Sequence, residues 1–408
     1  MASKRPRRQY GTGSVYRRAS DGRWLGKIQA GWTTTGTRRT ITVSAKTEAE
    51  CKQRLRDKQR EIDRDGIPVE STGRPTVKTW ADTWLPLHAT EVRPNTYTTD
   101  AGHVHKWIVP TLGHRRLEHL TPGDVRALRD AVTTSGAGLS AARGAHWTLM
   151  GMLKAARQEG HRVPANVTEA KAPPKGTSTR EAIPLDAALL LLDEASTSPS
   201  GARWVAALLQ GLRQGERLGL TRDMVDLSAG ELDISWQLQP LPYLDKKDRA
   251  KGFRVPDNYV ARHLVHSYHL VRPKTAQGQR IIPLTPWFAS ILATWLEVAP
   301  DNPWGLVWSD VDERNGKSRP TAYRASKDRE EWEALQASCG VAHPTGRPYT
   351  MHEARNTTAT LLFEAGVDTK VITQILGHSS IVTSRGYQTV SRDALREAME
   401  QLTKRLGR

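Results

Sequence analysis

Apolar residues at helical spacing predict a block of helices over residues 76–160. In the first helix they recur every three or four positions, on one face: Val77, Trp80, Ala81, Trp84 and Leu85. Thr121 is the predicted N-cap of a second helix, with Pro122 at its first position. Residues 140–158 give a further helix. The pattern therefore indicates a small helical domain.

Residues 1–65 follow a different pattern, in which three short β-type runs precede a helical stretch. The runs cover residues 14–16, 24–30 and 39–43, and Gly22 and Gly36 mark the turns between them. Cys51, Leu55 and Ile62 share one face of a helix predicted over residues 47–65. We therefore predict a compact module made of a three-stranded sheet and one helix.

The rest of the chain mixes helices with strands. Linkers rich in Gly, Pro, Ser or Thr, at residues 71–75 and 160–180, set off a third domain over residues 178–408. Its predicted elements are a buried helix at 204–212, a hairpin at 271–284 turning near Gly278, and helices from His352 to Gly366 and over 371–376. The predicted fold class is multidomain and mainly α with small β-sheets, ending in a mixed α+β domain.

Charge points to an anionic partner. The net charge is +17, and residues 1–44 hold ten Lys and Arg against one Asp. Nucleic acid is the usual partner of such a chain, and a solvated basic surface is the alternative.

Cysteine content and hydropathy bear on the cell compartment and on metal binding. The two cysteines, Cys51 and Cys339, lie far apart and form no metal-binding or disulfide pattern. No apolar run approaches the roughly 18 residues of a membrane helix, and no signal peptide is recognisable. We expect a cytoplasmic protein with no metal and no cofactor.

Six polar residues in the second half of the chain form an ordered set. His352 and Arg355 are three apart, so they face the same way on a helix. Gly377 suits the end of the next helix, and Tyr387 follows nine residues after His378. Each residue taken singly has an ordinary explanation, such as a surface Arg213–Glu216 pair. The complete set, in chain order, is Arg213, Lys274, His352, Arg355, His378 and Tyr387.

This order resembles the tyrosine recombinase, or phage integrase, family. Gln210, Ala354 and Asn356 depart from residues common in that family, but none of them removes a member of the set. The resemblance implies an arm-site DNA-binding domain at 1–65, a helical core-binding (SAM-like) domain at 76–160 and a catalytic domain at 178–408. It also implies that Lys274 enters the DNA minor groove and acts as general acid.

The chemistry fits these residue types. Tyrosine has a pKa of about 10, so only roughly a thousandth is ionised at pH 7, and it needs cationic help to act as a nucleophile. Arg213 and Arg355 suit a doubly hydrogen-bonded grip on phosphate, and His352 suits proton transfer. The resemblance implies that such a site cuts DNA through a 3′-phosphotyrosine and rejoins it.

We predict a site-specific recombinase that integrates and excises a phage or mobile element. The expected partners are double-stranded attachment sites, three further copies of the chain, an excisionase and a host DNA-bending protein. The alternatives are a Xer-like resolvase, a type IB topoisomerase and a non-catalytic DNA-binding regulator. Residues 235–270 exceed what a minimal catalytic domain needs, and extra DNA contact and an ordinary surface loop are equally compatible with them.

Overall fold

The structure is a computed structural model that describes residues 14–32, 38–65, 74–177, 179–314, 317–377 and 390–407. The chain forms two compact units. The first contains the N-terminal module and the helices up to Gly176, and the second begins at Thr177. The segment Ala89–Asn95 groups with the second unit.

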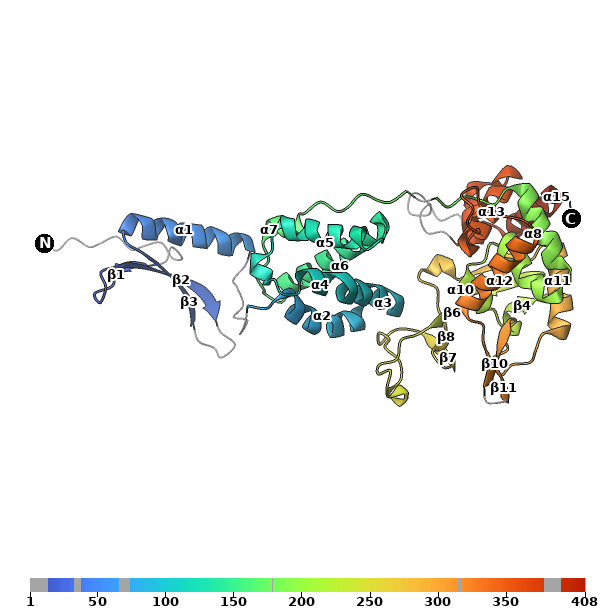
Figure 1. Ribbon diagram of the computed structural model, residues 1–408, viewed down its shortest axis with the longest axis horizontal. Coiled ribbons are helices and arrows are strands. Elements are labelled where there is room, and N and C mark those ends of the chain that lie inside the picture. Colours follow the sequence, from blue (N-terminus) through green and yellow to red (C-terminus); the bar gives the residue numbers. More distant parts are fainter. Residues whose placement is uncertain are drawn as a thin grey trace. The chain divides into compact units, whose positions relative to one another are not determined.

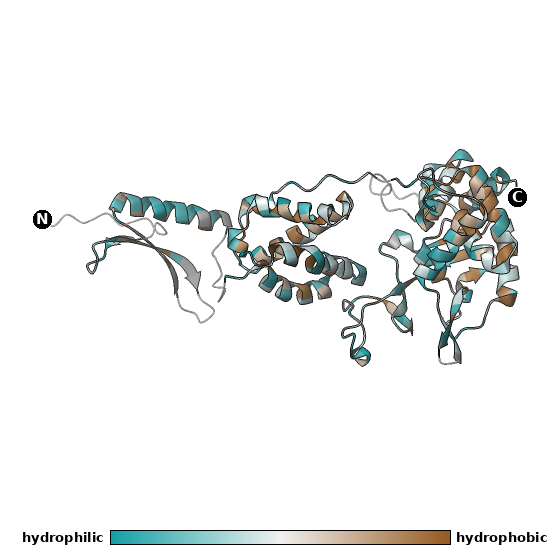
Figure 2. Cartoon of the chain, in the orientation of Figure 1, coloured by the Kyte–Doolittle hydropathy of each residue, from teal (hydrophilic) through white to brown (hydrophobic). Residues whose placement is uncertain are grey.

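Three antiparallel strands and one helix form the N-terminal module, which confirms the prediction. Strands β1 (Ser14–Arg17), β2 (Trp24–Trp32) and β3 (Arg38–Ala45) lie in that order, and α1 (Glu48–Asp65) packs on them (Figure 1). Gly26 allows this close approach, because a Cβ there would lie 2.7 Å from Leu55 Cδ1. Most of α1 is hydrophilic (Figure 2), and its buried strip includes Cys51 and Leu55.

A helical bundle follows, again as predicted. Its helices are α2 (Val77–Glu91), α3 (Pro94–His103), a π-helical turn (Val104–Ile108), α4 (Val109–Leu112), α5 (Pro122–Thr134), α6 (Leu139–Gln158) and α7 (Ala165–Thr168). Thr121 caps α5, since its Oγ1 accepts from the Asp124 amide at 3.3 Å. Trp80 lies in the core and donates from Nε1 to the Met152 carbonyl at 2.8 Å.

The second unit combines helices with short strands. Its helices are α8 (Leu185–Ser196), α9 (Ala202–Leu209), α10 (Gln214–Leu218), α11 (Pro286–Val298), α12 (Ala325–Ser338), α13 (Met351–Glu364), α14 (Thr369–Leu376) and α15 (Arg392–Arg405). Its strands are β4 (Val225–Asp226), β5 (Glu231–Ile234), β6 (Gln237–Pro240), β7 (Ala261–Val265), β8 (Tyr268–Val271), β9 (Arg280–Pro283), β10 (Ser309–Arg314) and β11 (Lys317–Ala322). This is the mixed α+β domain that the sequence predicts.

The strand pairing corrects one prediction. The expected hairpin over residues 271–284 is wrong, because β8 pairs with β6 and β7 whereas β9 pairs with β5. The two strands therefore lie in different antiparallel sheets, and residues 272–279 form a loop between them. Period-2 apolar spacing predicts strands, but it does not identify their partners.

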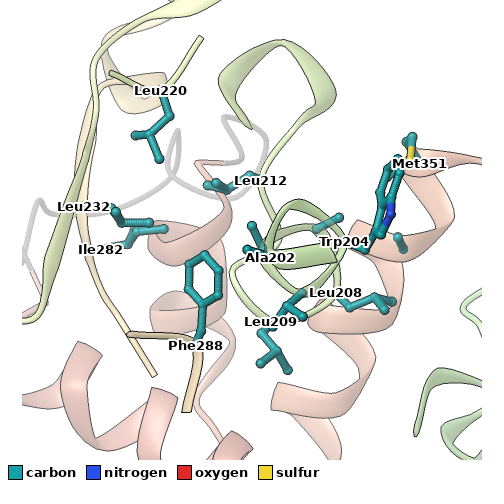
Figure 3. Close-up of a cluster of buried hydrophobic side chains, with 14 of the residues drawn as sticks. Ala202, Trp204, Leu208, Leu209, Leu212, Leu220, Leu232, Ile282, Phe288 and Met351 are labelled. Atoms are coloured by element: carbon teal, nitrogen blue, oxygen red, sulfur yellow. The ribbon is translucent and has the colours of Figure 1, made fainter. Parts of the chain in front are cut away.

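Helix α9 lies at the centre of the second unit. All eight of its residues are buried, and Trp204, Leu208 and Leu209 cluster with Phe288 and Ile282 (Figure 3). The helix ends earlier than predicted, because Gly211 adopts φ +57° and turns the chain. This turn brings Arg213 to the edge of the core.

Residues 235–270 are partly structured. They contain β6, β7 and most of β8, joined by a long loop in which Tyr243 pairs with Phe253 through a β-bridge. Trp236 is buried between the guanidinium groups of Arg262 and Arg272, at 4.2 and 3.9 Å from the ring centroid. The segment is thus a small sheet with a loop.

Candidate active site

Arg213 stands at the start of α10. Its backbone N–H donates to Glu216 Oε2 at 3.0 Å, and its Nη1 donates to Glu216 Oε1 at 2.6 Å. Its Nη2 donates to the Gly377 carbonyl at 3.1 Å. The Arg213 side chain is 39% exposed, whereas that of Glu216 is 1% exposed. The pair is therefore not a surface pair, since its carboxylate lies inside the domain.

Glu216 is the centre of an arginine cluster. Besides Arg213, it accepts from Arg280 Nη2 at 2.9 Å and Nη1 at 3.2 Å, and Arg355 Nη1 lies 3.8 Å from its Oε2. Burial raises the pKa of the Glu216 carboxyl, but Arg280, Arg213 and Arg355 outweigh burial and lower that pKa to about 2. One carboxylate thus faces three guanidinium groups, which leaves an excess of positive charge.

Arg355 lies on α13 and is buried, with 1% of its side chain exposed. Its Nη1 donates to the Gly211 carbonyl at 2.6 Å, and its Nη2 donates to the Leu376 carbonyl. Burial lowers the pKa of the Arg355 guanidinium, and the charge on Arg213 lowers it further. Arg355 therefore joins the turn after α9 to the end of α14.

A buried carboxylate fixes the start of α13. Glu353 accepts from the Thr350 amide at 2.7 Å in a capping box, from Arg347 Nη2 at 2.6 Å and from the Glu181 amide at 3.1 Å. Burial raises the pKa of the Glu353 carboxyl, but Arg347 and Thr350 lower it to about 2. The helix start that carries His352 and Arg355 is therefore held firmly.

His352 is exposed on α13, beside the arginine cluster. Partial burial of the ring lowers its pKa, and the positive charges of Arg180, Arg355 and Arg213 lower it further. The ring is therefore uncharged at neutral pH, the state in which it can accept a proton.

Lys274 is exposed in the loop between β8 and β9. A 3-10 turn, Ala276–Gly278, follows it. The loop is compact, since a Cβ at Gly278 would lie 2.5 Å from Pro273 Cβ.

His378 and Tyr387 lie outside the described residues, but the chain on either side of them is described. Gly377 ends α14 in the left-handed region, with φ 64° and ψ 49°, as predicted. Where the described chain resumes, the Val390 amide donates to Gln374 Oε1 of the same helix at 3.2 Å. Both flanks of residues 378–389 are thus attached to α14, and Arg213 bonds to the Gly377 carbonyl.

Arg280 is a residue that sequence reasoning missed. Its side chain is 4% exposed and lies within the cluster. A signal was present, because Arg280 and Ile282 share one side of a strand in which Ile281 is exposed and Ile282 buried. A charged residue on the buried side of a strand indicates a buried ion pair.

A second buried carboxylate anchors α10 from the other side. Asp328 of α12 accepts from Arg217 Nη2 at 2.6 Å and from Gln214 Nε2 at 2.6 Å. The side chains of Asp328 and Arg217 are completely buried. Gln214 and Arg217, which lie on either side of Glu216 in the chain, are therefore held by a residue outside α10.

Within the part of the chain that the structure describes, no group of three or more His, Cys, Asp or Glu side chains is placed to hold a metal ion. None of the described helices is long and apolar enough to cross a membrane.

Known proteins share both the sequence pattern and the fold. The chain matches the phage integrase family over residues 186–393 and the N-terminal SAM-like domain of phage integrases over residues 76–131. An integrase of Saccharopolyspora erythraea is 25% identical, with 96% of this chain and 95% of that protein aligned. An integrase of Streptomyces ambofaciens is 26% identical, over 94% and 93%.

Solved structures give the same fold. The Tn1549 transposon integrase in complex with transposon right end DNA has a TM-score of 0.58 at 19% identity, covering 80% of this chain and 99% of that one. A lambda integrase tetramer bound to a Holliday junction has a TM-score of 0.55 at 16% identity, covering 94% and 99%.

Together, fold and matches define a tyrosine-type site-specific recombinase. The chain belongs to the phage integrase family.

Proposed function

We propose that this recombinase integrates and excises a phage or mobile element through a 3′-phosphotyrosine formed by Tyr387. Arg213 and Arg355 hold the scissile phosphate, His352 and His378 assist proton transfer, and Lys274 protonates the leaving oxygen. The integrase relatives, aligned over nearly the whole chain, support this function.

The observation that carries the proposal is the arginine cluster around Glu216. Arg213 is partly exposed and Arg355 lies behind it, and both are bonded to carbonyls next to the end of α14. A phosphate beside Arg213 would meet an excess of positive charge that is already in place. Such preorganised charge stabilises the five-coordinate phosphorus of the transition state.

The reaction balances without an energy source. The Tyr387 hydroxyl gives its proton to neutral His352 as its oxygen bonds to phosphorus, and the bond to the 5′-oxygen breaks as that oxygen takes a proton from Lys274. A 5′-hydroxyl of the partner duplex then attacks the phosphotyrosine and releases the tyrosine. Rejoining reverses both proton transfers. Each step exchanges one phosphodiester for another, so ATP hydrolysis is not needed.

We assign a DNA-binding role to each domain. The module at 1–65 binds arm sites, the domain at 76–160 grips the core site, and the domain at 178–408 cuts it. The net charge of +17 and the DNA-bound structural neighbours support binding to duplex attachment sites. Four copies act together on two duplexes in the cytoplasm, with an excisionase and a host DNA-bending protein setting direction.

The first test is covalent capture on a nicked suicide duplex that carries the core site. The wild-type chain should form a protein–DNA adduct, whereas Tyr387→Phe should form none and still bind the duplex. The ring remains in the variant, so only the nucleophilic oxygen is lost. An adduct that persists in Tyr387→Phe would show that another residue is the nucleophile.

A further inference from the structure

Arg280 contacts three segments of the proposed active site at once. Its Nη1 and Nη2 donate to the two oxygens of Glu216, the carboxylate that also holds Arg213. Its Nη1 also donates to the Gly278 carbonyl at 3.1 Å, in the loop that carries Lys274. Its Nε donates to the Ile375 carbonyl at 2.6 Å, in the last turn of α14.

These contacts leave Arg280 no direct role in binding DNA. Its side chain is 4% exposed, and all three of its nitrogens have acceptors inside the protein. Arg355 is as enclosed, but its buried Nε has no acceptor among the described residues, whereas every nitrogen of Arg280 is already bonded to the protein. Arg280 therefore acts through its neighbours.

Arg280 is connected to Lys274 through contacts within the loop between β8 and β9. The Gly278 carbonyl is bonded to Arg280, and the Gly278 amide donates to the Thr275 carbonyl at 2.9 Å. Gly278 also lies against Pro273, the residue before Lys274. Both neighbours of Lys274 in the chain are therefore in contact with Gly278, which Arg280 holds.

The end of α14 packs against the same group. A Cβ at Gly377 would lie 3.0 Å from Arg280 Nη1 and 2.9 Å from the Gln277 carbonyl. Arg280 and the loop thus fill the space beside the segment whose carbonyls hold Arg213 and Arg355.

We infer that Arg280 is a positioning residue that sets the Lys274 loop in register with the arginines that hold the phosphate. This inference rests on the proposed function, in which Lys274 is the general acid. A planar guanidinium can serve several acceptors in fixed directions, which a lysine amine cannot do.

The test compares two leaving groups in the full-length chain. On a suicide duplex with the normal 5′-oxygen, Arg280→Met should slow adduct formation roughly 100-fold, the loss expected when a reactive group is misplaced by about 1 Å. On the same duplex with a bridging 5′-sulfur, most of that loss should disappear, because a thiolate leaves without a proton. Lys274→Ala should show the same selective rescue.

The milder variant Arg280→Lys guards against misfolding. The lysine amine keeps the positive charge beside Glu216 but cannot bond to Glu216, Gly278 and Ile375 together. Adduct formation should therefore slow on the oxygen substrate and stay near the wild-type rate on the sulfur substrate. Arg222→Met is the matched control, since Arg222 also donates to two backbone carbonyls, of Leu296 and Ala299, at the end of α11. Any loss in that control should be equal on both substrates.

The outcomes separate the two levels of the hypothesis. In one outcome the sulfur substrate restores the adduct rate of Lys274→Ala, but Arg280→Lys is slowed equally on both substrates. That result would overturn the role of Arg280 and leave Lys274 as the acid. An unchanged rate of Arg280→Lys and Arg280→Met on the oxygen substrate would overturn the role of Arg280 too. Failure of the sulfur substrate to rescue Lys274→Ala would instead remove Lys274 as the acid, and the inference with it.

Discussion

Arg213 shows how one side chain is prepared for a ligand. Glu216 and the Gly377 carbonyl fix two of its nitrogens, and over a third of the side chain stays exposed. Binding a phosphate therefore costs little side-chain conformational entropy, because the protein has already ordered the guanidinium.

Replacing Arg213 or Arg355 by alanine should slow adduct formation by roughly 10² to 10³, the scale for losing one preorganised donor. Arg213→Lys should recover little of this, because one amine cannot serve Glu216, Gly377 and a phosphate together. The measurement is the single-turnover adduct rate at saturating DNA. Near-wild-type rates in both alanine variants would place the phosphate elsewhere.

The pH dependence of the cleavage rate should report the protonation of His352. Its pKa is lowered, so the ring is neutral above its ordinary value of about 6.5 and gains a proton only in more acidic solution. If neutral His352 accepts a proton, the rate should fall as the pH drops through this lowered pKa. Arg180→Gln removes a charge that lowers the pKa, so the fall should begin at higher pH.

The control for this profile is Arg329→Gln, which removes an exposed positive charge that is not among the causes acting on His352. Its profile should match that of the wild type. If the cleavage rate of His352→Gln still falls at the same acidic pH, another group is responsible for that titration.

At the scale of elements, α10 is a short helix held from both sides. Glu216 connects it to β9 and α13, and Gln214 and Arg217 connect it to Asp328 of α12. A five-residue helix has little stability of its own. The position of Arg213 therefore depends on these buried ion pairs.

Asp328→Asn should lower the free energy of unfolding of the second unit by about 3–5 kcal/mol, the range for breaking a buried pair, because Arg217 would keep an uncompensated charge. Urea unfolding followed by tryptophan fluorescence measures the loss, and Trp204 and Trp332, whose ring centroids lie 5.5 Å apart near this site, contribute to that signal. Glu364→Gln, which breaks the exposed pair with Arg405, should cost about 1 kcal/mol or less. Equal losses in the two variants would contradict the anchoring role of Asp328.

At the scale of the molecule, over half of the net charge lies apart from the proposed chemistry. Residues 1–44 hold ten Lys and Arg and one Asp, a net +9 of the chain's +17, whereas every proposed catalytic residue lies beyond residue 200. Arm binding would then assemble the complex without changing the barrier of the cleavage step.

Deleting residues 1–65 should leave the adduct rate on a core-site duplex unchanged at saturating DNA. Integration between full-length attachment sites should fail, because the phosphate contacts of the basic module are lost. If both activities fall together, the module belongs to the catalytic core. If integration survives, the arm-binding role is wrong and the basic segment is only a nonspecific tether.

The sequence by itself determined the elements and the family. Periodicity placed the start of α2 and both ends of α6 and α13 to within one or two residues, and Gly377 marked the end of α14 because a left-handed residue there suits glycine. The ordered set from Arg213 to Tyr387 identified the class, since residue type and spacing along the chain carry that information. Which of these residues act in catalysis remains a prediction.

Only the tertiary structure decided how these residues are held. Strands β8 and β9 join different sheets, which period-2 spacing could not reveal because it specifies a face and not a partner. Glu216 gathers arginines from positions 213, 280 and 355, and burial makes that contact strong. Contacts between residues so far apart in the chain exist only when the core closes around them, so local sequence signals could not show that Arg280 lies among them.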